Sequence, residues 1–315
     1  MLDWEEKRRL IQIANLYYIE DCTQEQIAKK VGVSRSLISK LLQKARDFGM
    51  VEVYIKDEEF RTVQLEYQLE KKYNLKDVVV VSTSGLTTEM IKKAVGQAGS
   101  HYLSKNLKDV KRIGISWGST LLELVKEYPF EKREEIQVIP LVGGLGTKHV
   151  EMHSNQLAYE LSKKLNSTCS YLYAPAIVKT KELRDRLVKM KDISSVLEEG
   201  KHVDVALLSV GSPYTDATMS VLGYLEEKDL EQLRELGVVG DIASRFFDSE
   251  GKMVNHPLND KVIGLSLEQL KRIKKVIAVV QGSHKIESLS AALKGEYIDV
   301  LIIDDQTASV LIKEK

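Results

Sequence analysis

The chain has 315 residues, enough for about two domains. It is 43% hydrophobic and 29% charged, as in ordinary soluble proteins, and no apolar run approaches the ~20 residues that span a bilayer. Its net charge is zero, which excludes nucleic-acid binding driven by overall charge. We expect a cytoplasmic protein, because the N-terminus lacks a signal peptide and Cys22 and Cys169 are isolated thiols.

The N-terminal region predicts three short helices. Residues 3–19 have apolar side chains at helical spacing, which predicts the first helix. Thr23 predicts the start of the second, because its hydroxyl can cap the helix while a glutamine three residues later bonds back. Gly32 permits the positive φ of a tight turn, and Ser34 caps a third helix that ends at Gly49. Together these features predict a helix-turn-helix that enters a DNA groove.

The third predicted helix has an outer face without acidic residues. The segment from Ser34 to Arg46 contains four basic residues and no acid, so its local field is positive in a neutral chain. The alternative to DNA binding is a basic face that contacts only solvent. It does not explain why two helix caps, Thr23 and Ser34, and a central glycine occur together. We expect Arg35 and Lys40 to contact phosphates, with hydroxyl and amide groups nearest the base edges. The predicted DNA-binding residues are Thr23, Gln24, Ser34, Arg35, Ser36, Ser39, Lys40, Gln43 and Lys44.

A short strand and a charged helix are expected next. Residues 51–55 alternate between apolar and polar types, and residues 58–74 predict a helix with an irregular apolar stripe. This helix is either a linker or an oligomerisation helix. We favour the second use, because helix-turn-helix domains usually act as dimers. The expected division is a DNA-binding domain (1–57), the linker or oligomerisation helix (58–75) and an effector-binding domain (76–315).

From Lys76 onward, continuous apolar runs alternate with helical stretches. Such runs are typical of parallel strands covered by helices on both faces, so an α/β domain with a Rossmann-like parallel sheet is expected. Ligands of such sheets bind in the loops that follow the carboxyl ends of the strands. The predicted strands are residues 78–82, 112–116, 136–142, 203–210, 275–280 and 298–304.

Several of these loops contain glycine, hydroxyl and charged residues. Gly118, Ser119 and Thr120 open a helix, where backbone amides and the helix dipole attract an anion. Asp241, Arg245 and Lys285 follow later strands. Each loop alone has a structural explanation, because α/β proteins need Gly and Ser at such turns. Four such loops at one sheet edge nevertheless favour a polar pocket for a small anion.

One histidine pair superficially resembles a zinc motif. His149 and His153 are four residues apart, as in HExxH, but the intervening Glu151 is third rather than second. It is therefore out of position for a general base, and we expect only the surface start of a helix. No metal and no cofactor are expected.

Five segments together resemble the SorC family of bacterial transcription factors, of the deoxyribonucleoside-regulator type. They are LYYIEDCTQEQIAKKVGVSRSLISKLLQKARDFGMVEV, GISWGSTL, PLVGGLG, GDIASRFFDSEG and VIAVVQGSHKIESLSAALKGEYIDVLIIDDQTA. The resemblance covers nearly the whole chain. It implies an effector domain similar to sugar-phosphate isomerases and glucosamine-phosphate deaminase. It also implies a homotetramer that binds operator DNA under the control of a phosphorylated sugar.

The resemblance also implies roles for individual residues. Ser119, Thr120 and Lys285 would hold the phosphate, while the sugar hydroxyls would meet Gly144, Asn155 and Asp241. A cation such as Lys285 at a helix start suits a phosphate on physical grounds as well.

Two departures from the family pattern bear on function. Some relatives have a basic residue before the Gly-Gly pair, where this chain has Val142, so one anchor for the effector is absent. The deaminases have an Asp-Gly-His series where this chain has Asp241-Ile-Ala, so the catalytic His is missing. The competing hypothesis is an isomerase or deaminase with an attached DNA-binding domain, in which Asp241 or Asp248 would act as base. We favour a regulator in which the effector changes how subunits sit on one another, and so the spacing of the recognition helices.

Overall fold

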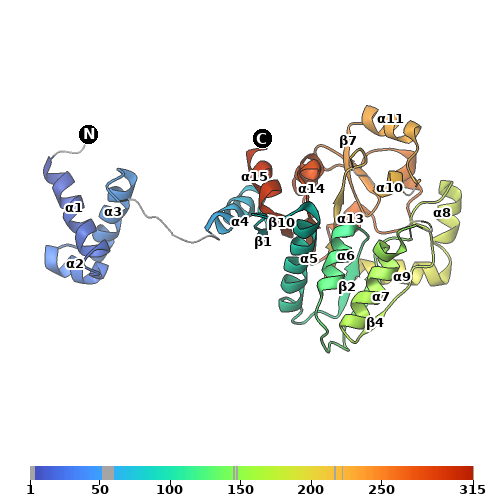
Figure 1. The fold of residues 1–315 in the computed structure, drawn as a ribbon, viewed down its shortest axis with the longest axis horizontal. Helices are drawn as coiled ribbons and strands as arrows, with labels where there is room; N and C mark the ends of the chain where they lie inside the picture. The colour runs from blue at the N-terminus through green and yellow to red at the C-terminus, as the bar shows by residue number, and fades with distance from the viewer. Residues whose placement is uncertain are drawn as a thin grey trace. The chain divides into compact units, whose positions relative to one another are not determined.

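The computed structural model describes residues 4–51, 60–144, 146, 148–215, 218–221 and 223–314. It divides into two units, residues 1–60 and 61–315, each of which is treated separately below (Figure 1). Most of the strand expected at 51–55 lies outside the described residues. No helix in the described ranges is both long and apolar enough to cross a membrane.

The first unit is a three-helix domain built as the sequence predicts. Its helices are α1 (Trp4–Tyr18), α2 (Gln24–Val31) and α3 (Arg35–Asp47), which pack around fully buried residues such as Ile13, Ile27 and Ile38. The capping box of α2 is present, since the Thr23 backbone N–H donates to Gln26 Oε1 at 2.8 Å. Because these end signals act locally, the helix boundaries follow the sequence closely.

The turns that follow α2 and α3 use glycine in the left-handed region. Gly32 ends α2 with φ 70°, and Ser34 then caps α3. After α3, Gly49 has φ 67°, its N–H bonds to Arg46 O at 2.9 Å, and Met50 N–H bonds to Ala45 O at 2.9 Å. This bond pair is the Schellman motif, which satisfies the last carbonyls of a helix.

The second unit is built on a seven-stranded parallel sheet, as far as the described residues show, in the order β1-β10-β9-β5-β2-β3-β4. The six predicted apolar runs all contribute strands to it. Its strands are β1 (Asp77–Val81), β2 (Arg112–Ile115), β3 (Gln137–Pro140), β4 (Thr168–Cys169), β5 (Val205–Leu208), β9 (Lys275–Val280) and β10 (Val300–Asp304).

Helices cover both faces of this sheet, so alternate residues of one strand enter two separate cores. Val300 and Ile302 of β10 pack with α5 (Thr88–Lys105), α6 (Ser119–Glu127) and α7 (Ser154–Lys164). Leu301 and Ile303 pack on the other face with α4 (Phe60–Tyr73), α9 (Lys191–Lys201), α14 (Ile286–Lys294) and α15 (Asp305–Lys313). Burial on both faces explains why the strands are continuous apolar runs.

The remaining helices are short connecting elements around this sheet. They are η1 (Val150–Met152), α8 (Lys181–Leu187), α10 (Thr218–Val221), α11 (Glu227–Glu235), α12 (Pro257–Asp260), α13 (Leu267–Leu270) and η2 (Ser283–Lys285).

A small antiparallel sheet replaces the loop expected around Asp241. It consists of β6 (Val210–Gly211), β7 (Val238–Ile242) and β8 (Arg245–Asp248). Ala243 and Ser244, with φ of 50° and 67°, form the turn between β7 and β8. Two consecutive positive φ values match the twist of a tight hairpin. The prediction of a loop was wrong. The hairpin was not recognised in the sequence because Ala243-Ser244 lacks the Asn-Gly or Asp-Gly signal of such turns.

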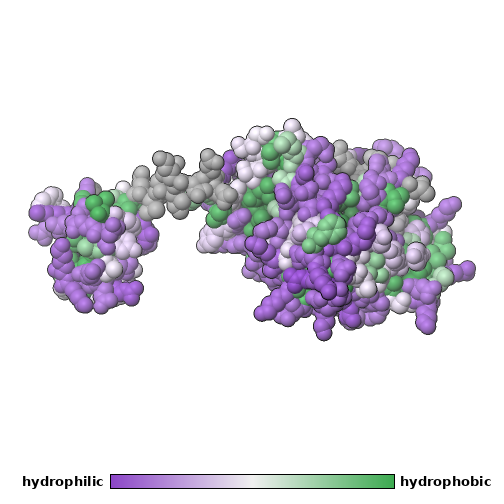
Figure 2. Space-filling model, turned by 60° about the horizontal axis from the view of Figure 1, so that its bottom comes forward, coloured by the Kyte–Doolittle hydropathy of each residue, from purple (hydrophilic) through white to green (hydrophobic). Residues whose placement is uncertain are grey.

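Helix α4, apart from its first residue, belongs to the second unit and packs against β1 and α15. Leu69 is fully buried there, Lys72 Nζ donates to Leu311 O at 3.1 Å, and the Glu66 carboxylate accepts from Val80 N–H at 2.9 Å. Two apolar residues of the same helix, Val63 and Tyr67, are 56% and 65% exposed. The surfaces of both units are otherwise mostly hydrophilic in the view of Figure 2, with scattered apolar patches. The exposed apolar residues Val63 and Tyr67 are consistent with the oligomerisation role that was expected for this helix.

Candidate functional site

The strand order creates a crevice at the carboxyl ends of β2 and β5. From β2 the chain proceeds to β3 and β4 on one side, whereas β5 lies on the other side of β2. The loops after β2 and β5 therefore diverge, which is where open α/β sheets bind ligands. Thr120 Oγ1 and Ser209 Oγ, one from each loop, are 3.1 Å apart and hydrogen-bonded.

A small cavity of about 50 Å³, which we call the inner compartment, lies in this crevice. It has room for a few heavy atoms of a ligand. Gly118 and Ser119 border it from the β2 side, and residues 209–213 border it from the β5 side. Asp241 and Ala243 from the hairpin and Lys285 from the loop after β9 also line it, and Asp241 and Lys285 supply its charged groups.

Asp241 is the buried acid of the inner compartment. It is 5% exposed, and burial raises the pKa of its carboxyl to about 6 from an ordinary 3.8. The Ser244 N–H, 3.1 Å from Oδ2, and the charge of Lys285 act in the opposite direction and favour the carboxylate. The facing strand residue is Gly211, where any Cβ would overlap Asp241 Oδ1. Gly211 is thus required for the acid to reach the cavity.

A larger cavity of about 500 Å³, the outer compartment, adjoins the inner one. Both compartments are lined by Ser119 and Lys285, so a ligand there would span two environments. The outer walls come from the first turns of α5, α6 and α15 and from loop 281–285. This loop is fixed by Asp304, whose carboxylate accepts from Gly282 N–H at 3.1 Å and from Thr307 N–H at 2.8 Å.

The structure brings together five of the eight predicted effector-binding residues. Gly118, Ser119, Thr120, Asp241 and Lys285 line one or both compartments. The other three, Gly144, Asn155 and Arg245, are absent from the described linings of both.

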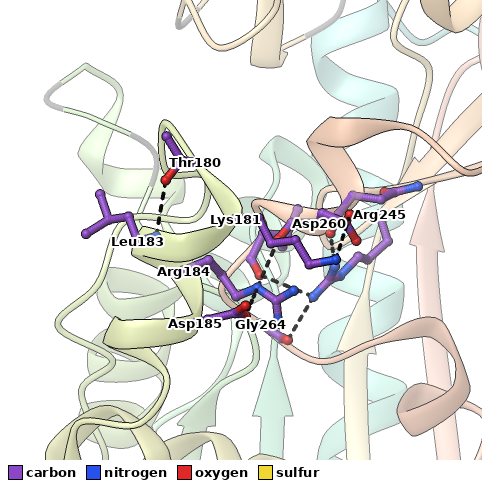
Figure 3. Close-up of polar contacts among 10 residues, drawn as sticks. Thr180, Lys181, Leu183, Arg184, Asp185, Arg245, Asp260 and Gly264 are labelled. Atoms are coloured by element: carbon purple, nitrogen blue, oxygen red, sulfur yellow. Dashed lines mark hydrogen bonds and ion pairs between the residues drawn. The ribbon is translucent and has the colours of Figure 1, made fainter.

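Arg245 is the clearest correction. Its guanidinium donates to the carbonyls of residues 259, 262, 264 and 265, and burial lowers its pKa to about 10. Figure 3 shows it pointing toward this backbone and toward Asp260, which also binds Lys181 at 3.2 Å. Alternation along β8 explains the placement, since the hairpin points successive side chains to opposite faces. Arg245 therefore holds the segment 259–265 and does not reach the cavities.

Asn155 and Gly144 also have structural contacts. The Asn155 amide donates to Leu172 O at 3.0 Å and accepts from Leu172 N–H at 2.9 Å, so both its ends are used. Gly144 N–H bonds to Ala174 O at 2.9 Å, and its own carbonyl accepts from Ala176 N–H at 2.7 Å. Both residues thus fix the chain segment 172–176.

Several lining residues are outside the predicted set, among them Ser209, Gly211 and Lys92. Gly211 follows the predicted strand 203–210, so the strand-end rule that selected Ser119 applies to it as well. Ser209 was expected inside that strand, but β5 ends at Leu208 and leaves Ser209 in the loop. Lys92 lies in the first turn of α5, which begins after the Thr87 cap. The signal there was a capped helix following β1, but the sequence does not show which side of that helix faces the cleft.

The His149/His153 pair lies before a helix, as expected, but only His149 is at the surface, with a side chain that is 49% exposed. His153 precedes α7 and is 5% exposed, with Nε2 3.1 Å from Lys148 O. Burial lowers its pKa, which favours the neutral ring. Within the described ranges, no cluster of three or more His, Cys, Asp or Glu side chains is arranged to hold a metal ion.

The predicted DNA-facing side of α3 is exposed over most of its length. Arg35, Ser39 and Lys40 have exposed side chains, whereas the Ser34 and Ser36 hydroxyls bond to one another at 3.0 Å. Gln43 donates to Asp47 at 2.8 Å. Thr23 is committed to its capping box, and Gln24 beside it is half-buried.

Lys44 was predicted to lie on the exposed outer face of α3, and the structure corrects this. It is half-buried and forms an ion pair with Glu6 of α1. The side chain lies at the edge of the polar face, where α1 crosses α3, so its charge is largely neutralised within the domain.

Comparison with known proteins gives a consistent family. The sugar-binding domain family matches residues 57–313. The chain is 31% identical over 313 residues to the deoxyribonucleoside regulator of Bacillus subtilis (strain 168), covering 99% of this chain and 100% of that protein. It is also 31% identical over 309 residues to the sorbitol operon regulator of Klebsiella pneumoniae, covering 97% and 98%.

Solved structures agree with these sequence matches. The full-length sorbitol operon regulator SorC from Klebsiella pneumoniae has a TM-score of 0.79 at 30% identity, covering 98% of this chain and 99% of that one. A DeoR family transcriptional regulator from Listeria monocytogenes has a TM-score of 0.76 at 44% identity, covering 79% and 99%. The likeness to SorC extends over both units, so this chain belongs to the SorC family of sugar-binding transcriptional regulators.

Proposed function

We propose that this chain is a transcriptional regulator whose operator binding is controlled by a phosphorylated sugar. One observation carries the proposal: Ser119 and Lys285 line both compartments of a cleft that also contains the buried Asp241. A lysine beside the start of a helix suits a phosphate, and an acid suits sugar hydroxyls. The exposed Arg35 and Lys40 of α3 are the proposed phosphate contacts on DNA.

Self-association is part of the same proposal. A helix-turn-helix usually binds as a dimer, so the exposed Val63 and Tyr67 of α4 are proposed to contact a second copy. An effector that favours one arrangement of subunits over another changes the spacing of the recognition helices.

An enzyme is the alternative, and one observation favours it. The raised pKa of Asp241, about 6, is close to the value that suits a general base near neutral pH. Against it, Ala243 lines the inner compartment in the position that a deaminase gives to histidine, and the curated relatives are named regulators. Incubation with sugar phosphates distinguishes the two, since steady product formation supports the enzyme and its absence the regulator.

A thermal-shift screen tests the effector class. Candidate sugar phosphates and their unphosphorylated sugars are added to the full chain. A ligand at a hundred times its Kd raises the free energy of unfolding by about 2.7 kcal/mol. We expect sugar phosphates to stabilise the chain and the parent sugars not to do so. Stabilisation by free sugars alone would contradict the phosphate assignment.

The variant Lys285→Ala then tests the position of the site. We expect it to abolish the effect of the stabilising ligand on operator binding, because the cation shared by both compartments is removed. Operator affinity without ligand should remain near that of the wild type, as measured by fluorescence anisotropy. A normal ligand response in this variant would move the site elsewhere.

A further inference from the structure

The outer compartment contains a cationic residue, Lys92, that was not predicted from the loops after the strands and that has no role in the proposed function. Lys92 projects from the first turn of α5 and lines this cavity together with Lys285 from the β9 loop. These two lysines reach the cavity from separate elements. Resting on the proposed function, in which Lys285 holds the phosphate, we infer that Lys92 is a second cationic ligand of that phosphate in the outer compartment.

Burial and charge support this assignment. The Lys92 side chain is 26% exposed, and its recorded ion partner is Glu89 at 3.5 Å, which is 85% exposed. An ion pair with so exposed a carboxylate is weak, because water screens it. A phosphate dianion in the cavity competes with Glu89 for Lys92 and carries twice its charge near neutral pH.

The acidic residues around the cavity do not oppose a phosphate strongly. Asp304 is 3% exposed, and its carboxylate is occupied by the N–H groups of Gly282 and Thr307 and by the Thr307 hydroxyl. Glu89 is the acid whose carboxylate lies mostly in water. The net effect inside the cavity is therefore set by the two lysines, and neutral donors such as Thr88 and Gln306 line the same walls.

The two compartments suit opposite ends of the effector. The inner compartment contains Asp241 and has room for a few heavy atoms, whereas the outer one is about ten times larger. A ligand with a hydrogen-bond donor at one end and a phosphate at the other matches both. The class indicated is a sugar monophosphate whose hydroxyl-bearing end enters beside Asp241 and whose phosphate lies between Lys92 and Lys285.

The test measures the affinity of the full chain for inorganic phosphate by thermal shift, at constant ionic strength and pH 7.5. Four single variants are compared: Lys92→Met, Glu89→Gln, Lys285→Met and Lys93→Met. Lys93 is the matched control, because it lies on the same helix, pairs with Glu127 at 3.4 Å and is 62% exposed. Methionine is unbranched and only one atom shorter than lysine, it carries no charge, and its helix propensity is similar.

We expect Lys92→Met to weaken phosphate binding about tenfold, which corresponds to about 1.4 kcal/mol. Glu89→Gln should strengthen it severalfold, because the competing carboxylate is removed. Lys93→Met should leave it unchanged. A merely structural role for Lys92 would not produce the opposite responses of Lys92→Met and Glu89→Gln.

The remaining outcomes separate this inference from the proposed function. If Lys285→Met weakens phosphate binding but Lys92→Met does not, the role of Lys92 is overturned and the effector site stands. If phosphate has no effect while a sugar phosphate stabilises the chain, the outer compartment is not a phosphate subsite. If neither phosphate nor any sugar phosphate binds, both the inference and the proposed function fail.

Discussion

The glycines of the two units have different functions. In the first unit, Gly32 and Gly49 have positive φ, and a Cβ added to either would meet nothing within 4 Å. In the second unit, a Cβ on Gly96 of α5 would lie 2.6 Å from Glu123 Cβ of α6, and one on Gly114 would overlap Leu141. The small unit uses glycine for chain direction. The large unit also has such turn glycines, for example Gly85 and Gly237, but at Gly96 and Gly114 it uses glycine to bring elements close together.

This difference indicates how each unit is specified. The turn glycines of the first unit depend on their own backbone and its local capping bonds. Gly96 depends on α6, a helix that lies more than twenty residues further along the chain. An added side chain should therefore meet only backbone strain at Gly32 and Gly49, but steric overlap at Gly96 and Gly114.

The largest predicted effect is that of Gly96→Val. The new side chain would clash with the Glu123 and Leu124 backbone, so α5 and α6 must separate. We expect the free energy of unfolding of the second unit to fall by about 3 kcal/mol, the upper end of typical overpacking costs. Ligand binding should weaken as well, because both helices line the outer compartment. Urea unfolding followed by near-UV circular dichroism measures the loss.

Gly32→Ala is the matched change in the first unit. An alanine in the left-handed region costs about 1 kcal/mol, and here it meets no neighbour. Its cost should appear in operator binding and in the stability of the first unit alone. Equal losses in both variants would show that the contrast between turn and packing glycines is wrong.

The same contrast explains which parts of the fold could be predicted from the sequence. Gly32, Ser34 and the Thr23 capping box act within a few residues, so sequence spacing is sufficient to identify them. The six parallel strands were predictable because burial on both faces leaves continuous apolar runs. The β7–β8 hairpin was not, because its positive-φ turn is formed by Ala243 and Ser244.

The candidate site was predictable only in part, for a related reason. Residues directly after a strand, such as Ser119 and Lys285, come to the cleft by topology alone. Arg245 lies within the hairpin strand β8, where side-chain direction depends on register. The four carbonyls that it binds belong to residues 259–265, and a loop prediction offered no way to anticipate them.

An intermediate effect is expected for Asp241→Asn, and it depends on pH. The folded pKa of Asp241, about 6, lies above its ordinary value of 3.8. The buried carboxylate therefore lowers the free energy of unfolding above pH 6, and this penalty disappears below about pH 4, where both states are protonated. At pH 8 the variant should be more stable than the wild type by up to about 3 kcal/mol, because each pKa unit of the shift corresponds to about 1.4 kcal/mol.

Urea unfolding of both proteins between pH 4 and pH 8 measures this difference. We expect it to shrink steadily as the pH falls through 6 toward 4. The variant should also bind the effector less tightly, because an amide replaces the acceptor that meets the sugar. A stability difference that is constant with pH would mean that the carboxylate is not destabilised by burial. None of the described acids of the first unit is buried, so we expect no variant there to show a comparable pH dependence of stability.

A small effect is expected when two basic residues of α3 are compared. Arg35 is exposed, whereas Lys44 is paired with Glu6. Arg35→Ala and Lys44→Ala each remove one positive charge. A difference in operator binding between the two variants therefore comes from where that charge lies on α3. Losing a phosphate contact should lower the slope of log K against log salt by about 0.9, and operator affinity by about 1 kcal/mol. Lys44→Ala should leave the slope nearly unchanged, because its charge is already compensated within the domain.

Fluorescence anisotropy with operator DNA at several salt concentrations measures both slopes. Equal decreases in slope would mean that Lys44 leaves Glu6 and contacts DNA, and the polar face would then extend to the end of α3. A decrease for Arg35 alone would confine the phosphate contacts to the first turns of the helix. Because a half-exposed ion pair contributes at most about 1 kcal/mol, the Glu6 contact itself does not decide the outcome, and only the DNA measurement does.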